Sequence, residues 1–210
     1  MADQKTKLTT RIILNAIFPV MKVVVSDDLK INKRFQGVDA RVQFVAHDNG
    51  EQHGASLVFT KGELSICQGI ADSADITFSF SSLKKFNDFL AGKPVLPKIS
   101  GFMKFGLLTK IISLLLAMKL MMPNARPKAF DKKRLKVKMI IYMITTALSQ
   151  YNKGGDPEMT AWTGKQPDRI YQMSVAGEED IAPYVRVKPG KSKAGRGLYK
   201  RRRPFGHIRF

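Results

Sequence analysis

The sequence predicts an α+β fold in which helices cover one face of an antiparallel sheet. Residues 40–69 contain three β-like runs that are separated by turn-forming residues. Apolar residues recur at helical spacing on both sides of this region, over 8–25, 83–91 and 105–122. Strands joined by short turns pair antiparallel, so these helices are expected to pack on the resulting sheet.

The opening helix is expected over 8–25, bent or divided at Pro19, because proline lacks the N–H that a helix interior requires. Its basic start and apolar run are also features of a secretion signal. Lys22 interrupts the run and no small-residue cleavage site follows, so a helix of the folded domain is the preferred interpretation.

The central segment 40–69 is interpreted as an antiparallel meander. The turn-rich "DNGEQHG" (48–54) separates the first two runs, and the tight "KG" at 61–62 separates the second from the third.

A fourth strand is expected at 76–80, because Phe78 and Phe80 alternate with polar residues. A short helix follows over 83–91, with Ser81 or Ser82 able to accept the first free N–H groups. The aromatic side chains of these two segments are expected to form core, and the same positions also suit the wall of a cavity.

The apolar helix 105–122 has a wider apolar surface than a core requires. Its polar residues gather with Ala117 in one narrow stripe, and roughly two thirds of the circumference is apolar. Lys110 and Lys119 lie within the run and argue against a membrane span. The surplus apolar surface is expected to face a second chain or an apolar ligand.

A faint internal repeat predicts two copies of one supersecondary unit. "KGELSICQG" (61–69) resembles "PGKSKAGRG" (189–197), and the helix-like stretch 136–152 takes the place of the opening helix. The expected domains are a complete unit at 1–122, a linker at 123–135, and an incomplete second copy at 136–210. The second copy lacks covering helices, so a homodimer, a partner chain or the first domain is expected to cover its sheet.

The net charge of +19 predicts attraction to polyanions. Much of the excess lies in 132–138 and 188–203 and not in an even stripe with interleaved aromatics, so an anionic membrane surface is a candidate partner and nucleic acid is a less favoured one. Cys67 is the single cysteine, which excludes an internal disulfide and fits a cytoplasmic protein. The three histidines are scattered, so no metal or other cofactor and no catalytic cluster is expected.

Residues 54–115 contain a Lys-Gly hairpin, an "ADIT" strand before a Ser-initiated helix, an "LAGK" helix end, and "ISGFMKFG" before an apolar helix. In their order and spacing these features resemble the sterol-carrier-protein-two family of lipid-binding domains, over about the first 120 residues. The resemblance implies a five-stranded antiparallel sheet and helices around a lipophilic tunnel. It also implies binding of sterols, fatty acyl chains, acyl-CoA or phospholipids without catalysis.

The predicted function is therefore non-enzymatic carriage of a long-chain lipid. The alternative is an accessory subunit whose apolar surfaces dock a second copy or an enzyme of lipid metabolism. Lys104, Lys110 or Lys119 is expected to meet the ligand's carboxylate or phosphate at the mouth of the tunnel. The candidate lining residues are Leu57, Phe59, Ile66, Phe78, Phe80, Phe86, Phe89, Leu90, Phe102, Met103, Leu107, Ile111, Ile112, Leu115 and Met118.

Overall fold

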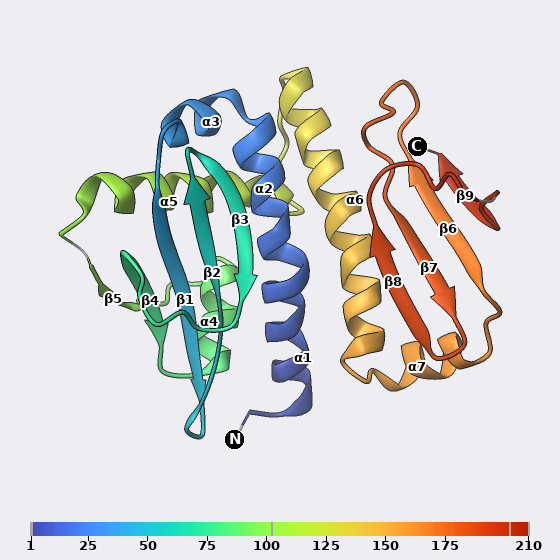
Figure 1. Cartoon of the computed structure of the whole chain (residues 1–210), viewed down its shortest axis with the longest axis horizontal. Coiled ribbons are helices and arrows are strands. Elements are labelled where there is room, and N and C mark those ends of the chain that lie inside the picture. The colour runs from blue at the N-terminus through green and yellow to red at the C-terminus, as the bar shows by residue number, and fades with distance from the viewer. Residues whose placement is uncertain (1, 102, 202, 210) are drawn as a thin grey trace. The chain divides into compact units, whose positions relative to one another are not determined.

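The computed structural model describes residues 2–101, 103–201 and 203–209. The chain divides into two compact units, Met1–Lys136 and Val137–Phe210. Each unit combines one sheet with helices, so the fold is α+β as the sequence predicts (Figure 1).

The first unit opens with four helical elements: the first three form the helix that is expected over 8–25, and the fourth is a separate short helix. They are α1 (Gln4–Ile12), the π-helical segment η1 (Ile13–Ile17), α2 (Phe18–Asp27) and α3 (Leu29–Phe35). The carboxylate of Asp3 caps α1 by accepting from the Thr6 N–H at 2.6 Å. The π-helical turn lies directly before Pro19, where the missing proline N–H interrupts the α-helical ladder.

The helical segment Gln4–Asp27 is long and apolar enough to cross a membrane by length and composition. In this structure 56% of an apolar 18-residue stretch of this segment is buried within the protein, as in a core helix.

The predicted meander is present as β1 (Ala40–Asp48), β2 (Glu51–Thr60) and β3 (Glu63–Gln68). Both turns contain two residues at positive φ, Asn49-Gly50 and Lys61-Gly62, as the twist of a tight hairpin requires. The first turn is therefore shorter than expected, and β2 begins at Glu51.

The expectation of a wholly antiparallel sheet is wrong at one pairing. Strand β4 (Ile76–Phe80) pairs parallel to β1, and the short strand β5 (Lys98–Ser100) pairs antiparallel to β4. The strand order is β3-β2-β1-β4-β5. Strand β3 lies at one edge of the sheet, and the chain passes β2 and β1 before it enters β4. Strand β4 therefore runs in the same direction as β1.

The core of the first unit lies on the helix-covered face of this sheet. Phe44 of β1 stacks on Phe78 of β4, with ring centroids 4.8 Å apart, and Phe18 of α2 meets Phe44 edge-on at 5.1 Å. Phe86 of α4 (Leu83–Leu90) packs against Phe18 and Phe80. Ser82 caps α4 by accepting from the Lys85 N–H.

The apolar helix is α5 (Phe105–Met118), which is followed by the 3₁₀ turn η2 (Lys119–Met121). Its buried side chains are Ile111, Leu114 and Met118, and the helix lies against α2 and α3.

The second unit repeats the strand order of the first. Strands β6 (Arg169–Ser174), β7 (Tyr184–Lys188), β8 (Lys191–Gly195) and β9 (Gly206–Arg209) form a sheet of order β8-β7-β6-β9. The pairing of β6 with β9 is parallel, as is that of β1 with β4. Helix α6 (Phe130–Lys153) precedes this sheet, and α7 (Pro157–Gly164), which the sequence did not suggest, lies against β7 and β8.

A buried glutamine holds the crossover connection in each unit. Gln43 of β1 accepts the Ala71 N–H at 3.1 Å, and Gln172 of β6 accepts the Tyr199 N–H at 3.0 Å. Ala71 and Tyr199 both lie between the third and fourth strands of their sheets, so the two units use the same device.

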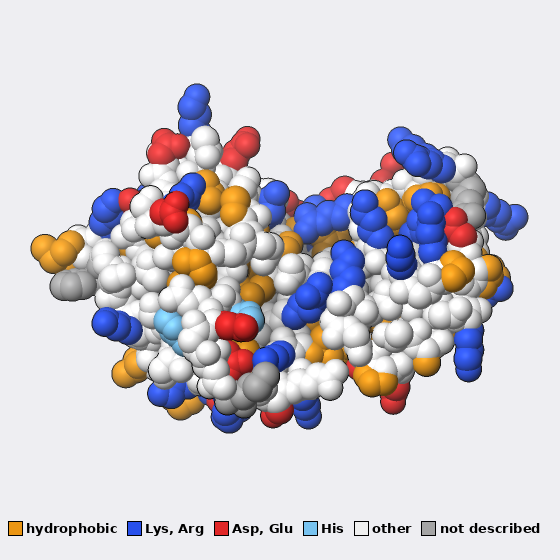
Figure 2. Space-filling view, turned by 60° about the horizontal axis from the view of Figure 1, so that its bottom comes forward, with side chains coloured by type: hydrophobic (Ala, Val, Ile, Leu, Met, Phe, Trp, Pro, Cys, Tyr) orange, Lys and Arg blue, Asp and Glu red, His pale blue; other side chains and the backbone are white. Residues whose placement is uncertain are grey.

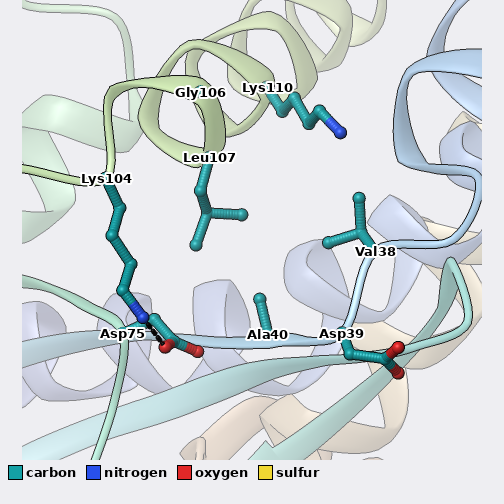
Figure 3. A pocket seen from close by; sticks show the side chains of 8 residues that line it. All are labelled: Val38, Asp39, Ala40, Asp75, Lys104, Gly106, Leu107 and Lys110. Carbon is teal, nitrogen blue, oxygen red and sulfur yellow. Dashed lines mark hydrogen bonds and ion pairs between the residues drawn. The ribbon is translucent and has the colours of Figure 1, made fainter.

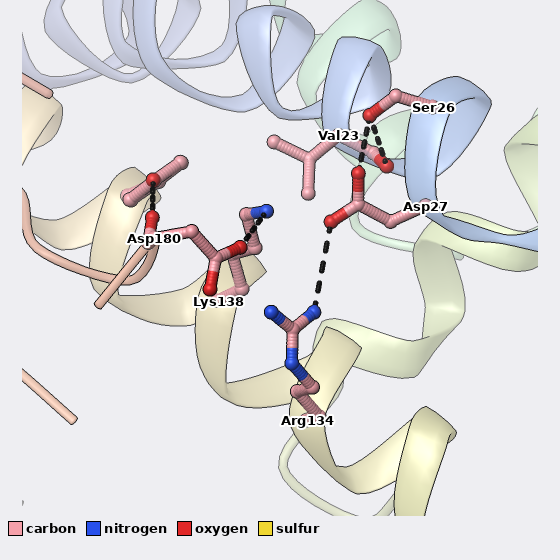
Figure 4. Close-up of polar contacts among 7 residues, drawn as sticks. Val23, Ser26, Asp27, Arg134, Lys138 and Asp180 are labelled. Atoms are coloured by element: carbon pink, nitrogen blue, oxygen red, sulfur yellow. Dashed lines mark hydrogen bonds and ion pairs between the residues drawn. The ribbon is translucent and has the colours of Figure 1, made fainter. Parts of the chain in front are cut away.

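Helix α6 contributes to both units, and ion pairs fix each part (Figure 4). Within the first unit, Arg134 faces Asp27 at 4.0 Å and Lys132 lies 2.5 Å from the carboxylate of Asp28. Within the second unit, Lys138 pairs with Asp180 at 2.7 Å.

Candidate functional site

A pocket of about 350 Å³ opens in the first unit beside the first turn of α5 (Figure 3). The sheet side of its wall is Val38, Asp39 and Ala40, at the start of β1, together with Asp75 before β4. The α5 side of its wall is Lys104, Gly106, Leu107 and Lys110.

Asp75 connects the two walls of this pocket. Its carboxylate accepts a hydrogen bond from the Lys104 ammonium group and another, of 2.7 Å, from the Arg41 backbone N–H. These two bonds, the Lys104 bond first, lower the pKa of Asp75 below its usual value of 3.8. The Lys104 charge is therefore balanced by Asp75.

Lys110 supplies a second cation at the pocket, and no ion pair is recorded for it in the described part of the chain. Asp39, on the opposite wall, accepts the Lys61 N–H at 2.8 Å and so is tied to the β2–β3 turn. An incoming carboxylate or phosphate would meet Lys110 as its cationic partner.

The approach to α5 is held close to β4 by Gly101. Its φ is +76°, and a Cβ at this position would collide with the carbonyl oxygen of Asp75. Glycine is required for this close approach, which places Lys104 within reach of Asp75.

Helix α5 leaves much of its apolar surface in solvent. Phe105 is 63% exposed, Ile112 45% and Leu116 54%, on the side away from the buried Ile111 and Leu114. Between these sides, Ser113 accepts a hydrogen bond from Arg34 of α3, which fixes the polar stripe against the neighbouring helix.

The predicted lining residues fall into different environments. Those buried in the core are Leu57, Phe59, Phe78, Phe80, Phe86, Ile111 and Met118. Those that are half-buried are Ile66, Phe89, Leu90, Leu107 and Leu115. Met103 and Ile112 are exposed, and Phe102 lies outside the described residues.

Of these predicted residues, Leu107 lines the pocket. Lys104 and Lys110, predicted near the mouth of a cavity, also line it, whereas Lys119 is exposed in η2. Sequence reasoning missed Val38, Asp39, Ala40 and Asp75. No local sequence pattern indicates that Asp75 lies beside Lys104.

The residues that the structure describes include no group of three or more His, Cys, Asp and Glu side chains that could hold a metal ion. Cys67 is an exposed free thiol.

The chain has a remote structural likeness to a solved protein. No family model matches the chain, and no curated protein matches it. Among solved structures, the chain is similar to the sterol carrier protein domain 2 of Helicoverpa armigera, with 17% sequence identity and a TM-score of 0.39. The match covers 56% of this chain and 95% of that one.

Proposed function

We propose that the first unit binds and carries a long-chain hydrophobic ligand, such as a fatty acyl lipid or a sterol-like molecule, without catalysis. The exposed apolar surface of α5 carries this proposal. A helix packed only against its own domain would place Ile112 and Leu116 in the core or replace them with polar residues, because exposed clusters of large apolar side chains are uncommon in soluble proteins.

The pocket beside α5 suits the polar end of such a ligand. Its apolar wall includes Val38, Ala40 and Leu107, and Lys110 adds a positive charge. Its volume of about 350 Å³ is near the lower end of small-ligand sites, which is enough for a headgroup and the first part of a chain.

The rest of the ligand is expected to lie along the exposed side of α5. The exposed side chains Phe105, Ile112 and Leu116 lie on another side of α5 from the pocket residue Lys110, so the ligand would have to pass around the first turn of the helix. Covering apolar area contributes about 25 cal/mol per Å², so affinity would depend on chain length more than on specific polar contacts.

The side chains around the exposed side of α5 would accept hydrophobic ligands of different shapes. Leu108 and Leu115 are half-buried next to the exposed positions, and Met103 before the helix is 77% exposed. Unbranched methionine side chains adapt to guests of different shape. We also propose a cytoplasmic location, which suits the free Cys67 thiol.

The test is extraction of the purified protein with organic solvent, followed by mass spectrometry, and titration of the stripped protein with a pyrene-labelled fatty acid. We expect stoichiometric lipid in the extract and saturable binding. The double variant Ile112→Ser/Leu116→Ser is expected to weaken binding about tenfold, since it removes apolar contact worth roughly 1–2 kcal/mol.

The matched control is Leu29→Ser/Leu198→Ser, which also replaces two large apolar side chains with serine. These two positions are 74% and 50% exposed and lie outside α5. It is expected to bind the probe as the unchanged protein does. An empty extract together with a dimer that the Ile112→Ser/Leu116→Ser variant dissociates would instead support the accessory-subunit alternative.

A further inference from the structure

A second pocket, of about 520 Å³, lies in the second unit and is strongly cationic. Its wall includes Lys153 from the end of α6 and Arg186, Lys188, Lys191 and Lys193 from the β7–β8 hairpin, and none of the described residues that line it is acidic. Figure 2 shows Lys and Arg side chains crowded over the part of the molecule on the right, which the second unit forms.

The hairpin places like charges opposite one another. Lys188 pairs in register with Lys191, and Arg186 with Lys193. Directly opposed like charges destabilise an antiparallel pair, so the apolar residues on the other side of the hairpin must hold it together. Val185 and Val187 are buried there, at 4% and 0% exposure.

Carboxylates of the protein balance little of this charge. Asp168 binds Arg186 in a bidentate pair, with nitrogen–oxygen distances of 2.9 and 2.6 Å, and this bonding raises the pKa of Arg186. Within the described part of the chain, no ion pair is recorded for Lys153, Lys188, Lys191 or Lys193. Among the described residues, four ammonium groups therefore share one pocket without a carboxylate partner.

The floor of the pocket is fixed by a buried hydrogen-bond network. Asn152 donates to Thr163 at 2.9 Å and accepts from the Ser192 hydroxyl at 3.1 Å, and Ser149 donates to the Ser192 carbonyl at 3.0 Å. The N–H of Gly190, in the hairpin turn, donates to the Thr163 carbonyl at 3.1 Å. The lysines thus project from a scaffold that is ordered before any ligand arrives, which lowers the entropic cost of binding.

We propose that this pocket binds a compact, multiply charged phosphoryl ligand. Several ammonium groups around one cavity match an anion whose charge is concentrated, and lysine is a regular phosphate ligand as a point charge. The volume suits a small molecule or a headgroup, whereas a nucleic acid would call for a stripe of cations along an extended surface. The site lies in the second unit and goes beyond the lipid carriage proposed for the first.

The experiment uses the full chain, inorganic pyrophosphate in calorimetric titration, and sedimentation with phosphatidylcholine vesicles that contain or lack phosphatidylinositol bisphosphate. The site variant is Lys188→Gln/Lys191→Gln/Lys193→Gln. The control variant is Lys30→Gln/Lys85→Gln/Lys98→Gln, which removes the same charge from exposed positions of the first unit.

We expect pyrophosphate to bind the unchanged protein and the control alike, and to bind the site variant about tenfold or more weakly, with affinity falling as salt rises. Sedimentation only with the bisphosphate vesicles, lost in the site variant, identifies a lipid headgroup as the source of the phosphate. Binding of pyrophosphate with no vesicle sedimentation identifies a soluble ligand.

Absence of binding to both probes would overturn the proposal. So would equal loss in the two variants, which would mean that overall charge alone is responsible. DNA binding through the same lysines, without pyrophosphate binding, would also overturn it in favour of a nucleic-acid surface.

Discussion

Asp75 joins segments that are distant in the chain. Its carboxylate binds Lys104 and the Arg41 N–H, while its own N–H donates to the Arg41 carbonyl at 2.7 Å. The start of β1, the entry to β4 and the approach to α5 are thereby fixed around the pocket. The shape of the pocket therefore depends on the ionised form of one side chain.

Acid should weaken this junction. Because the folded protein lowers the pKa of Asp75 below 3.8, its ionised form contributes stability above that value, and the contribution is lost as the pH falls through the folded pKa. The variant Asp75→Asn should thus cost under about 1 kcal/mol of unfolding free energy near neutral pH, since solvent screens this partly exposed pair. The difference from the unchanged protein should begin to shrink as the pH falls through 3.8, and it should disappear once the pH is below the lowered pKa of Asp75 in the folded protein.

Urea unfolding across a pH series measures this difference. Asp72→Asn, at an exposed position three residues earlier, is the control and should leave the profile unchanged. A difference that persists undiminished in strong acid would contradict the assignment of the effect to the Asp75 charge.

Single residues were predictable where their role is local. The Ser82 cap and the Lys61-Gly62 turn follow from the identities of adjacent residues, and the sequence indicates both. The pocket residues Val38 and Asp75 come together only after β1 and β4 pair, so the residues next to them in the chain do not indicate that they line a pocket.

The β2–β3 hairpin depends on Gly62 for two reasons. Its φ is +89°, and a Cβ there would lie 2.5 Å from the Phe35 carbonyl oxygen. At Gly50, in the β1–β2 turn, φ is +85° but a Cβ meets open space. A side chain added at Gly50 therefore introduces backbone strain alone, whereas one added at Gly62 introduces both strain and a steric clash.

We expect Gly62→Ala to cost more than about 2 kcal/mol of unfolding free energy, and Gly50→Ala about 1 kcal/mol, because only the first adds a steric clash to the strain of a left-handed alanine. Chemical denaturation with both variants measures the two values. Equal losses would show that Phe35 moves aside without cost.

The helices and strands were easier to foresee than their pairing. Periodicity located α4, α5 and the meander, because amphipathic spacing is a property of each segment alone. The parallel direction of β4 depends on where its crossover travels, and the turn η1 depends on Pro19 within a long helix. The direction of β4 is not encoded in a single window of residues, whereas an interruption of the opening helix at Pro19 is expected from that residue alone.

The two units should respond separately to damage in their cores. Gln172 is 1% exposed, and its amide donates to the carbonyls of Met173, Ala182 and Pro183 at 2.9–3.1 Å. Gln172→Ala removes these bonds and leaves buried carbonyls unsatisfied, so we expect a loss of about 2–3 kcal/mol confined to the second unit.

Scanning calorimetry distinguishes the units. Gly62→Ala should lower the melting temperature of the first unit, and Gln172→Ala should lower that of the second unit. The control Gln52→Ala, at an exposed position, should change neither melting temperature. One transition that moves as a whole in both variants would show that α6 couples the units into a single cooperative structure.

The repeated strand order also imposes a sequence of events on folding. In each sheet the first three strands are consecutive in the chain, and tight turns join β1 to β2, β2 to β3 and β7 to β8, whereas the parallel partner pairs with a strand that is remote in the chain, at a greater cost in loop entropy. The fourth strand is therefore expected to join each sheet after the first three. During synthesis, a nascent chain exposes one edge of each meander until that strand arrives, and the buried glutamine that holds its crossover acts only at this closing step.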